Sequence, residues 1–151
     1  MRLDVRVDYA TRRAAPGRAA IARWAKAAAS GLRRARAAVG VRIVGEAESA
    51  GLNERYRGRR GPTNVLAFPF DAPRVARNRT LGDLVICAPV VNREARRQGK
   101  PTASHWAHMV VHGIMHLRGY DHATRREAAA MEHKEAAVLR RLGYVDPYSM
   151  E

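Results

Sequence analysis

The spacing of apolar side chains along the chain predicts an alternation of strands and helices. Alternating or short apolar runs predict strands at residues 3–9, 38–47, 63–70 and 81–88. Apolar residues at helical spacing predict helices at residues 18–36, 49–57, 89–98, 103–118 and from Thr124 to about Leu142. Trp24 falls on the apolar face of the first helix and is expected in the core. The pattern is typical of an α+β domain.

Several residues mark where the predicted helices begin and end. Pro89 is favoured in the first turn of a helix, and Gly119 allows a helix to stop. Thr124 and Glu127 have the spacing of a capping box at the start of the last helix. The polar segment 71–80 has no apolar periodicity and predicts a mobile loop between two strands.

The length of 151 residues suits a single domain, which we expect to span residues 1–151. No apolar run reaches the roughly 18–20 residues that a membrane span needs, and the N-terminus lacks the apolar region of a secretory signal. The lone Cys87 cannot form an internal disulfide, which fits a reducing compartment. We therefore expect a soluble cytoplasmic protein with no membrane partner.

The chain is strongly basic, with 28 Lys and Arg residues against 14 Asp and Glu residues and a formal net charge of +14. Almost all of the positive charge is arginine. Such an excess attracts a polyanion, because phosphates release counterions when cationic side chains bind them. The charge favours a nucleic acid as partner, although a genome-wide arginine bias would produce the same composition.

Five of the six histidines lie close together in the chain. His112 and His116 are four residues apart in a predicted helix, so their side chains differ by only about 40° around its axis. His108 shares that face but lies about 12 Å from His116 along the helix, too far for one ion to bind all three. Gly119 allows the chain to turn back, which can bring His122 to the other two. We predict that His112, His116 and His122 bind one metal ion.

Three protein ligands leave a fourth position on the metal for water, which is typical of catalytic zinc sites. Zinc lowers the pKa of bound water toward about 7 and so supplies a nucleophile at neutral pH. We therefore expect a hydrolase with one Zn²⁺ per chain and no nucleotide cofactor. Nickel and copper also bind such sites, and the sequence does not choose among the metals. The alternative for each histidine taken singly is an ordinary core or surface role.

The spacing H-x₃-H-x₂-G-x₂-H equals that of the metzincin proteases, but the residue after the first histidine differs. Those proteases carry a general-base glutamate there, whereas this chain has Gly113. A peptidase mechanism is therefore incomplete. The glycine costs about 1 kcal/mol of helix propensity against alanine. It either serves packing or opens room for a bulky substrate beside the metal.

Other residues near the histidines have candidate supporting roles. His105 and His108 share the ligand face, and they either support the ligands, contact RNA, or are surface or partly buried histidines. Asp121 either orients a ligand histidine or caps the next helix. His133 is expected to be an ordinary residue on the face of the last helix.

The segment HGIMHLRGYDH, residues 112–122, closely resembles the HGxLHLxGYDH signature of the YbeY family of bacterial endoribonucleases. Further blocks that resemble this family are LNERYRG at 52–58, PTNVLAFPF at 62–70, LGDLVIC at 81–87, HWAHMVVHG at 105–113 and LGYVDPY at 142–148. The departures are Met115 where leucine is usual and Ala67 where serine is common. Neither residue is a proposed ligand. The first 45 residues carry little of the resemblance.

The resemblance implies an α+β domain in which a mixed sheet of about four strands packs with helices, with a zincin-like helix at the metal site. It implies a zinc-dependent, single-strand-specific endoribonuclease that processes the 3′ end of small-subunit ribosomal RNA and takes part in ribosome quality control. Ribosomal RNA and the small ribosomal subunit would be its partners. The zinc-binding histidines of the family fall on His112, His116 and His122, and a proposed phosphate-contacting arginine falls on Arg57.

Elementary chemistry agrees with a catalytic role for Arg57, because a guanidinium can hold a phosphate bidentately and neutralise charge that develops on it. Arg59 and Arg60 follow closely and either extend this RNA contact or belong to a solvated charged loop. Two other hypotheses stay open. One is a non-catalytic module that binds RNA or the ribosome and has a structural metal. The other is a different zinc hydrolase that acts on peptides or small amides.

Overall fold

A mixed sheet forms the centre of the protein. The computed structural model describes residues 2–33, 36–70 and 80–149. In these residues the sheet has four strands, β1 (Arg2–Tyr9), β2 (Arg36–Val44), β3 (Val65–Pro69) and β4 (Gly82–Cys87). Their order across the sheet is β1-β2-β4-β3. β1, β2 and β4 are parallel, whereas β3 is antiparallel to β4 at one edge. This arrangement confirms the predicted mixed sheet.

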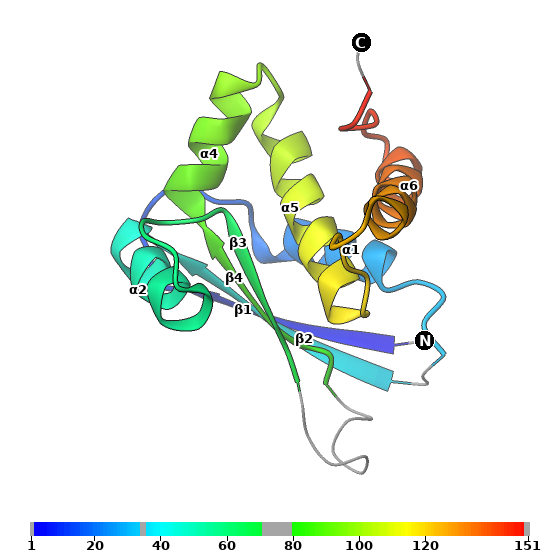
Figure 1. Ribbon diagram of the computed structural model, residues 1–151, viewed down its shortest axis with the longest axis horizontal. Helices are drawn as coiled ribbons and strands as arrows, with labels where there is room; N and C mark the ends of the chain where they lie inside the picture. The colour runs from blue at the N-terminus through cyan, green and yellow to red at the C-terminus, as the bar shows by residue number, and fades with distance from the viewer. Residues whose placement is uncertain (1, 34–35, 71–79, 150–151) are drawn as a thin grey trace.

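Helices cover both faces of the sheet unequally (Figure 1). The described residues contain the five helices α1 (Arg18–Ala28), α2 (Glu46–Arg57), α4 (Ala88–Arg97), α5 (Thr102–Leu117) and α6 (Arg125–Arg141). α5 crosses one face, where it packs on β3 and β4 and lies between α1, α4 and α6. α2 packs against β4 on the opposite face. The most buried helix is thus also the one that carries the histidine signature.

The alternation of side chains along the strands supplies an apolar core on each face. The larger core lies between the sheet and the helices α1, α5 and α6, and its largest side chains are Trp24 and Trp106. A smaller cluster lies beneath α2, where Leu52 packs against four buried residues, Val44, Leu66, Val85 and Cys87. Burial of apolar area is the main favourable term in folding, so these two clusters fix α5 and α2 relative to the same strands. The expected core position of Trp24 is confirmed.

The helix predicted over residues 18–36 was wrong at its C-terminal end. α1 ends at Ala28, and the chain is already extended at Arg36. Arg36 pairs with Arg2 in the parallel ladder, so the strand has to begin there. The turn between the helix and the strand contains Gly31, whose φ of +87° is incompatible with a continuing helix. Leu32, which was placed on the helix, packs against the core from the turn that follows α1.

The other predicted elements agree with the structure to within a few residues. The capping box is present in part, since Oγ1 of Thr124 accepts a hydrogen bond from the backbone N of Glu127 at 3.1 Å. The mobile loop predicted at 71–80 lies outside the described residues, except for Thr80. Within the parts of the chain that the structure describes, no helix combines the length and the apolar character needed to cross a membrane.

Candidate metal centre

α5 carries four histidines along one side, at positions 105, 108, 112 and 116. Its other side is apolar and packs on the sheet, which holds the helix in place. Gly113 permits this close packing, because a Cβ at that position would lie 2.7 Å from Cδ2 of Leu84 in β4. Leu84 therefore fills the room that the missing side chain leaves. Of the two interpretations of this glycine, packing is the one that the structure supports.

His112, His116 and His122 come together where α5 ends. The Nε2 atoms of His112 and His116 are 3.2 Å apart. The ring centroid of His122 lies 5.1 Å from that of His116 and 6.4 Å from that of His112. Gly119 adopts a φ of +100°, which residues with a side chain rarely do, and so lets the chain turn back. The structure thus places in one cluster the three histidines that the sequence spacing selected.

The histidine cluster is open to solvent. The side chain of His112 is 26% exposed and that of His122 is 56% exposed. Burial lowers the pKa of His116, and the neighbouring His112 and His122 lower it further. A lowered pKa favours the neutral imidazole that a metal ion requires. The cluster is therefore accessible to a substrate.

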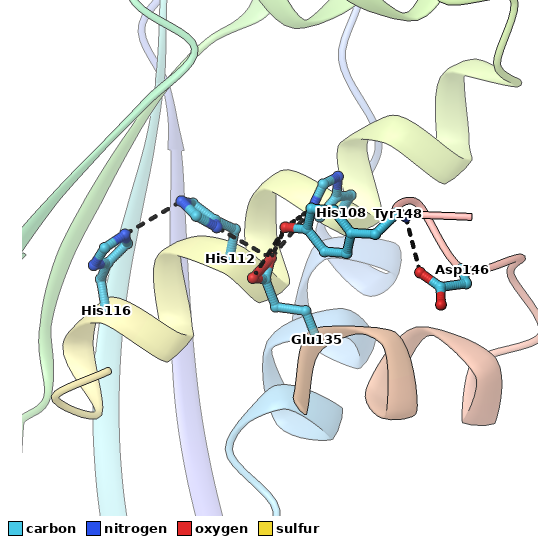
Figure 2. A network of polar contacts seen from close by, with 6 residues as sticks. All are labelled: His108, His112, His116, Glu135, Asp146 and Tyr148. Carbon is cyan, nitrogen blue, oxygen red and sulfur yellow. Dashed lines mark hydrogen bonds and ion pairs between the residues drawn. The ribbon is translucent and has the colours of Figure 1, made fainter. Parts of the chain in front are cut away.

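A buried glutamate of α6 contacts the inner side of this cluster (Figure 2). Oε1 of Glu135 lies 3.0 Å from Nδ1 of His112, 3.1 Å from Nε2 of His108 and 3.0 Å from the hydroxyl of Tyr148. Burial alone would raise the pKa of Glu135, but the hydrogen bonds from His108 and His112 outweigh it and lower the pKa to about 2. Glu135 is consequently an ionised acceptor at neutral pH.

Two groups in the described residues have ligand atoms close enough together to hold a metal ion. One is the buried group of His108, His112 and Glu135; the other is His116, Asp121 and His122. The groups meet at His112 and His116, whose Nε2 atoms are neighbours. In the buried group the histidine nitrogens already lie at hydrogen-bond distance from Glu135. The three predicted ligands are thus divided between the two groups, with His112 in the buried one and His116 and His122 in the exposed one.

The exposed histidines fit a transition-metal ion. Two nitrogen ligands bound at about 2.0–2.1 Å in tetrahedral geometry lie about 3.3 Å apart. The Nε2 atoms of His112 and His116 are separated by 3.2 Å, which is close to this value. Imidazole suits zinc, nickel and copper, so the donor set agrees with the metal implied by the resemblance without selecting it.

The histidines line a cleft of about 790 Å³. Tyr56 and Arg57, from the end of α2, line the same cleft, as do the residues of β3. The structure therefore brings Arg57 and the three histidines to one cleft, although Arg57 and His112 are more than 50 residues apart in the sequence. Arg59 is exposed but does not line this cleft.

A second hollow, of about 830 Å³, lies on the sheet face opposite α5. Its lining has more carboxylates than guanidinium groups, and within the described residues it includes no histidine; its charged members are Asp4, Asp8, Glu48, Asp83, Arg6 and Arg42. Carboxylates repel phosphate groups, so charge and chemistry both favour the smaller, histidine-lined cleft as the candidate active site.

Comparison with known proteins identifies the family of this chain. A family model described as Endoribonuclease YbeY matches residues 10–143. The chain belongs to the YbeY family of endoribonucleases. Among curated relatives, the Endoribonuclease YbeY of Methylococcus capsulatus is 55% identical over 146 residues, which cover 97% of this chain and 95% of that protein. The Endoribonuclease YbeY of Alkalilimnicola ehrlichii is 54% identical over 154 residues, which cover 99% of this chain and 93% of that protein.

A solved structure supports the fold alone. The solution structure of TM1509 from Thermotoga maritima has a TM-score of 0.57 and is 22% identical, with 97% of this chain and 99% of that chain covered. Membership in the YbeY family confirms the resemblance drawn from the signature, and the structural neighbour agrees with the α+β fold that the resemblance implied.

Within this YbeY-family fold, the other candidate residues have different surroundings. His108 is 9% exposed and His105 is 3% exposed, so both are too buried to contact RNA here. His105 instead contacts Oε1 of Glu94 at 2.9 Å. Asp121 supports the ligand turn, since its Oδ1 accepts a hydrogen bond from the backbone N of His122 at 2.7 Å. The alternative role for Asp121, capping the next helix, falls to Thr124. His133 lies exposed on α6, as expected.

Sequence reasoning missed Glu135 and Tyr148. A signal for Glu135 was present, because it lies four residues after Met131 and four before Leu139, both of which are buried on α6. A carboxylate at an apolar position of a helix requires a hydrogen-bonded or charged partner. Tyr148 ends the block LGYVDPY that resembles the family, but its contact with Glu135 depends on the path of the chain after α6.

Proposed function

We propose that this chain is a zinc-dependent endoribonuclease that cleaves single-stranded RNA at the centre formed by His112, His116 and His122. We further propose that its substrate is ribosomal RNA, with roles in 3′-end maturation of small-subunit RNA and in ribosome quality control. The observation that carries the proposal is the convergence of the three histidines and Arg57 in one cleft. The reaction class, cleavage of RNA, follows from membership in the YbeY family.

Each part of the cleft has a separate chemical task. His112, His116 and His122 would hold the metal, which when bound supplies a Lewis acid and activates water at neutral pH. Arg57 would bind the scissile phosphate and neutralise the charge that builds up on it. Its exposed guanidinium can reach a phosphate in solution without prior rearrangement of the core. The net charge of +14 would draw the RNA to the protein.

The route of proton transfer stays open between two possibilities. Within the described part of the cleft, Asp121 is the one lining carboxylate, and its Oδ1 already accepts the backbone N–H of His122. The attacking nucleophile is either water or the 2′-hydroxyl of the RNA. Analysis of the products separates the two, because attack by the 2′-hydroxyl leaves a 2′,3′-cyclic phosphate whereas attack by water does not.

The experiment that tests the function measures metal content and RNA cleavage on the same preparations. Purified wild type is compared with His116→Ala and with His133→Ala, an exposed histidine of α6 outside the cleft. We expect about one zinc per chain and RNA cleavage in the wild type and in His133→Ala. In His116→Ala we expect both to be lost while circular dichroism stays unchanged.

Two outcomes would contradict the proposal. Zinc in the wild type with no cleavage of free RNA or of ribosomal subunits would favour the binding module. Cleavage of peptides without cleavage of RNA would favour the other zinc hydrolase. If His116→Ala fails to fold, His122→Ala replaces it. The side chain of His122 is 56% exposed, so its removal takes little from the core.

A further inference from the structure

From the contacts around His112 we infer that Glu135, held by Tyr148, is a positioning residue that fixes the His112 ring with its Nε2 lone pair toward the metal position. This inference rests on the proposed metal centre and adds to it two residues from outside the signature. It concerns a carboxylate that does not itself reach the cleft, since Glu135 is 1% exposed and does not line it.

The first step of the argument concerns the acceptor. A carboxylate oxygen accepts hydrogen bonds, whereas an imidazole N–H and a tyrosine hydroxyl donate them, so groups of these kinds around one carboxylate oxygen share it as their acceptor. Three groups lie within hydrogen-bond distance of Oε1, and they come from His108, His112 and the hydroxyl of Tyr148. The buried charge is therefore fully engaged, which is the condition for keeping a carboxylate away from water.

The second step concerns the tautomer of His112. A neutral imidazole has one N–H and one lone pair. Because Nδ1 of His112 donates to Glu135 at 3.0 Å, the lone pair has to be on Nε2. Nε2 is the atom that lies 3.2 Å from Nε2 of His116, on the cleft side. Figure 2 shows His112 between Glu135 and His116, with its two nitrogens directed to opposite partners.

The third step concerns Tyr148, which controls the orientation of the carboxylate. Its hydroxyl lies 3.0 Å from Oε1 and 3.2 Å from Oε2 of Glu135. The backbone N of Tyr148 donates to Oδ1 of Asp146 at 2.8 Å, which shapes the turn that brings the tyrosine back to α6. A metal-binding histidine whose other nitrogen donates to a carboxylate is held in one tautomer and becomes a better ligand.

The protein itself supplies a matched control. Glu94 of α4 also accepts a hydrogen bond from a buried histidine of α5, with Oε1 of Glu94 2.9 Å from Nε2 of His105. His105 lies seven residues before His112 and does not line the cleft. A change of glutamate to glutamine thus removes, in both cases, a carboxylate that contacts a histidine of α5, beside a predicted metal ligand in one case and away from it in the other.

The test compares wild type, Glu135→Gln and Glu94→Gln in two measurements. The first is the affinity for zinc, measured by competition with a chromophoric chelator. We expect Glu135→Gln to bind zinc about 10–100-fold more weakly and Glu94→Gln to bind it as the wild type does. The second is the nitrogen NMR spectrum of the imidazoles in the metal-free protein. We expect His112 to carry its proton on Nδ1 in the wild type and to populate the Nε2–H form in Glu135→Gln, because a glutamine amide can also donate.

A weaker substitution keeps the test decisive if Glu135→Gln does not fold. Tyr148→Phe removes only the hydroxyl that orients the carboxylate, and we expect it to weaken zinc binding by about fivefold. The inference is overturned if folded Glu135→Gln keeps wild-type zinc affinity and the wild-type tautomer of His112. Failure of the proposed function looks different: the wild type would bind no zinc, while the NMR comparison of the metal-free proteins would still report on Glu135.

Discussion

Arg57 is the cationic side chain that the structure brings to the histidine cluster from another helix. It occupies the last turn of α2, is exposed, and lines the cleft together with His112, His116 and His122. The Arg57 side chain is exposed in the free protein and is not packed against the core. Its contribution to the reaction therefore depends on the substrate, because a guanidinium stabilises a phosphate most strongly when extra charge develops on it.

We predict that Arg57→Ala lowers the rate of RNA cleavage by about 10²–10³-fold while zinc content and circular dichroism stay as in the wild type. Arg55→Ala is the matched control, because Arg55 is exposed on the same helix but does not line the cleft. Single-turnover cleavage of a labelled single-stranded RNA measures the effect. Equal losses of cleavage rate in Arg57→Ala and Arg55→Ala would show that Arg57 contributes only to the overall positive charge.

The site residues differ in how far they could be predicted from sequence. His112 and His116 could be predicted because four residues of helix bring two side chains together whatever the rest of the chain does. His122 required only a turn at Gly119. Glu135 contacts His112 across 23 residues, and that contact depends on how α6 packs on α5. Local spacing carries no information on such packing, so the support of the centre emerges only from the structure.

At the level of elements, α4 and α5 are joined by a polar contact beside their apolar packing. Glu94 of α4 accepts hydrogen bonds from His105 of α5 and from Asn64. Burial acts to raise the pKa of Glu94, but the hydrogen bonds from His105 and Asn64 outweigh it and lower that pKa below its usual value. The same carboxylate thus ties two helices to the segment that precedes β3.

The lowered pKa predicts how Glu94 contributes to stability at different pH values. As the pH falls, Glu94 is protonated in the unfolded chain at about pH 4.3 and in the folded protein only at a lower pH. The stabilisation of the folded state by the Glu94 carboxylate is therefore present above about pH 4.3 and is lost as the pH falls through the folded pKa. We predict that Glu94→Gln lowers the free energy of unfolding at neutral pH and that the difference from wild type shrinks in acid. Urea unfolding at a series of pH values measures it. If the difference in free energy of unfolding between wild type and Glu94→Gln stays constant with pH, the charge of Glu94 does not contribute to stability.

The boundaries of the elements were predicted best where a local signal exists. Thr124 begins α6 as its capping pattern indicates, because the cap is made within one turn. The end of α1 was missed, because the alanine-rich composition of the stretch hides the turn at Gly31, whose φ is +87°, and the start of the strand depends on the pairing of Arg36 with Arg2. Propensity describes what a segment prefers alone, whereas a parallel ladder imposes its register on both partners.

At the scale of the whole molecule, the proposed metal would join the end of α5 to the turn that follows it. Its ligands would come from a buried helix and from an exposed turn. The mixed sheet and its two cores form from apolar residues, so we expect the fold to persist without the metal. The enzyme class was predictable from the signature, while the order of the strands is a property of the complete fold.

We predict that zinc raises the melting temperature of the metal-free protein without changing its secondary structure. A ligand that binds only the folded state at about 100 times its Kd stabilises it by about 2.7 kcal/mol, or about 5–10 °C for a chain of this size. Differential scanning calorimetry with and without zinc measures the shift. His116→Ala should show almost no shift, and an equal shift in this variant would place the metal elsewhere.

The contact between Tyr148 and Glu135 also has a consequence for how the enzyme matures. Synthesis proceeds from the N-terminus, so His112, His116 and His122 leave the ribosome before α6 and the turn that carries Tyr148. A nascent chain therefore exposes three metal ligands before the carboxylate that orients one of them is available. If Glu135 positions His112 as proposed, the complete centre forms only after Tyr148 has been synthesised and α6 has packed on α5.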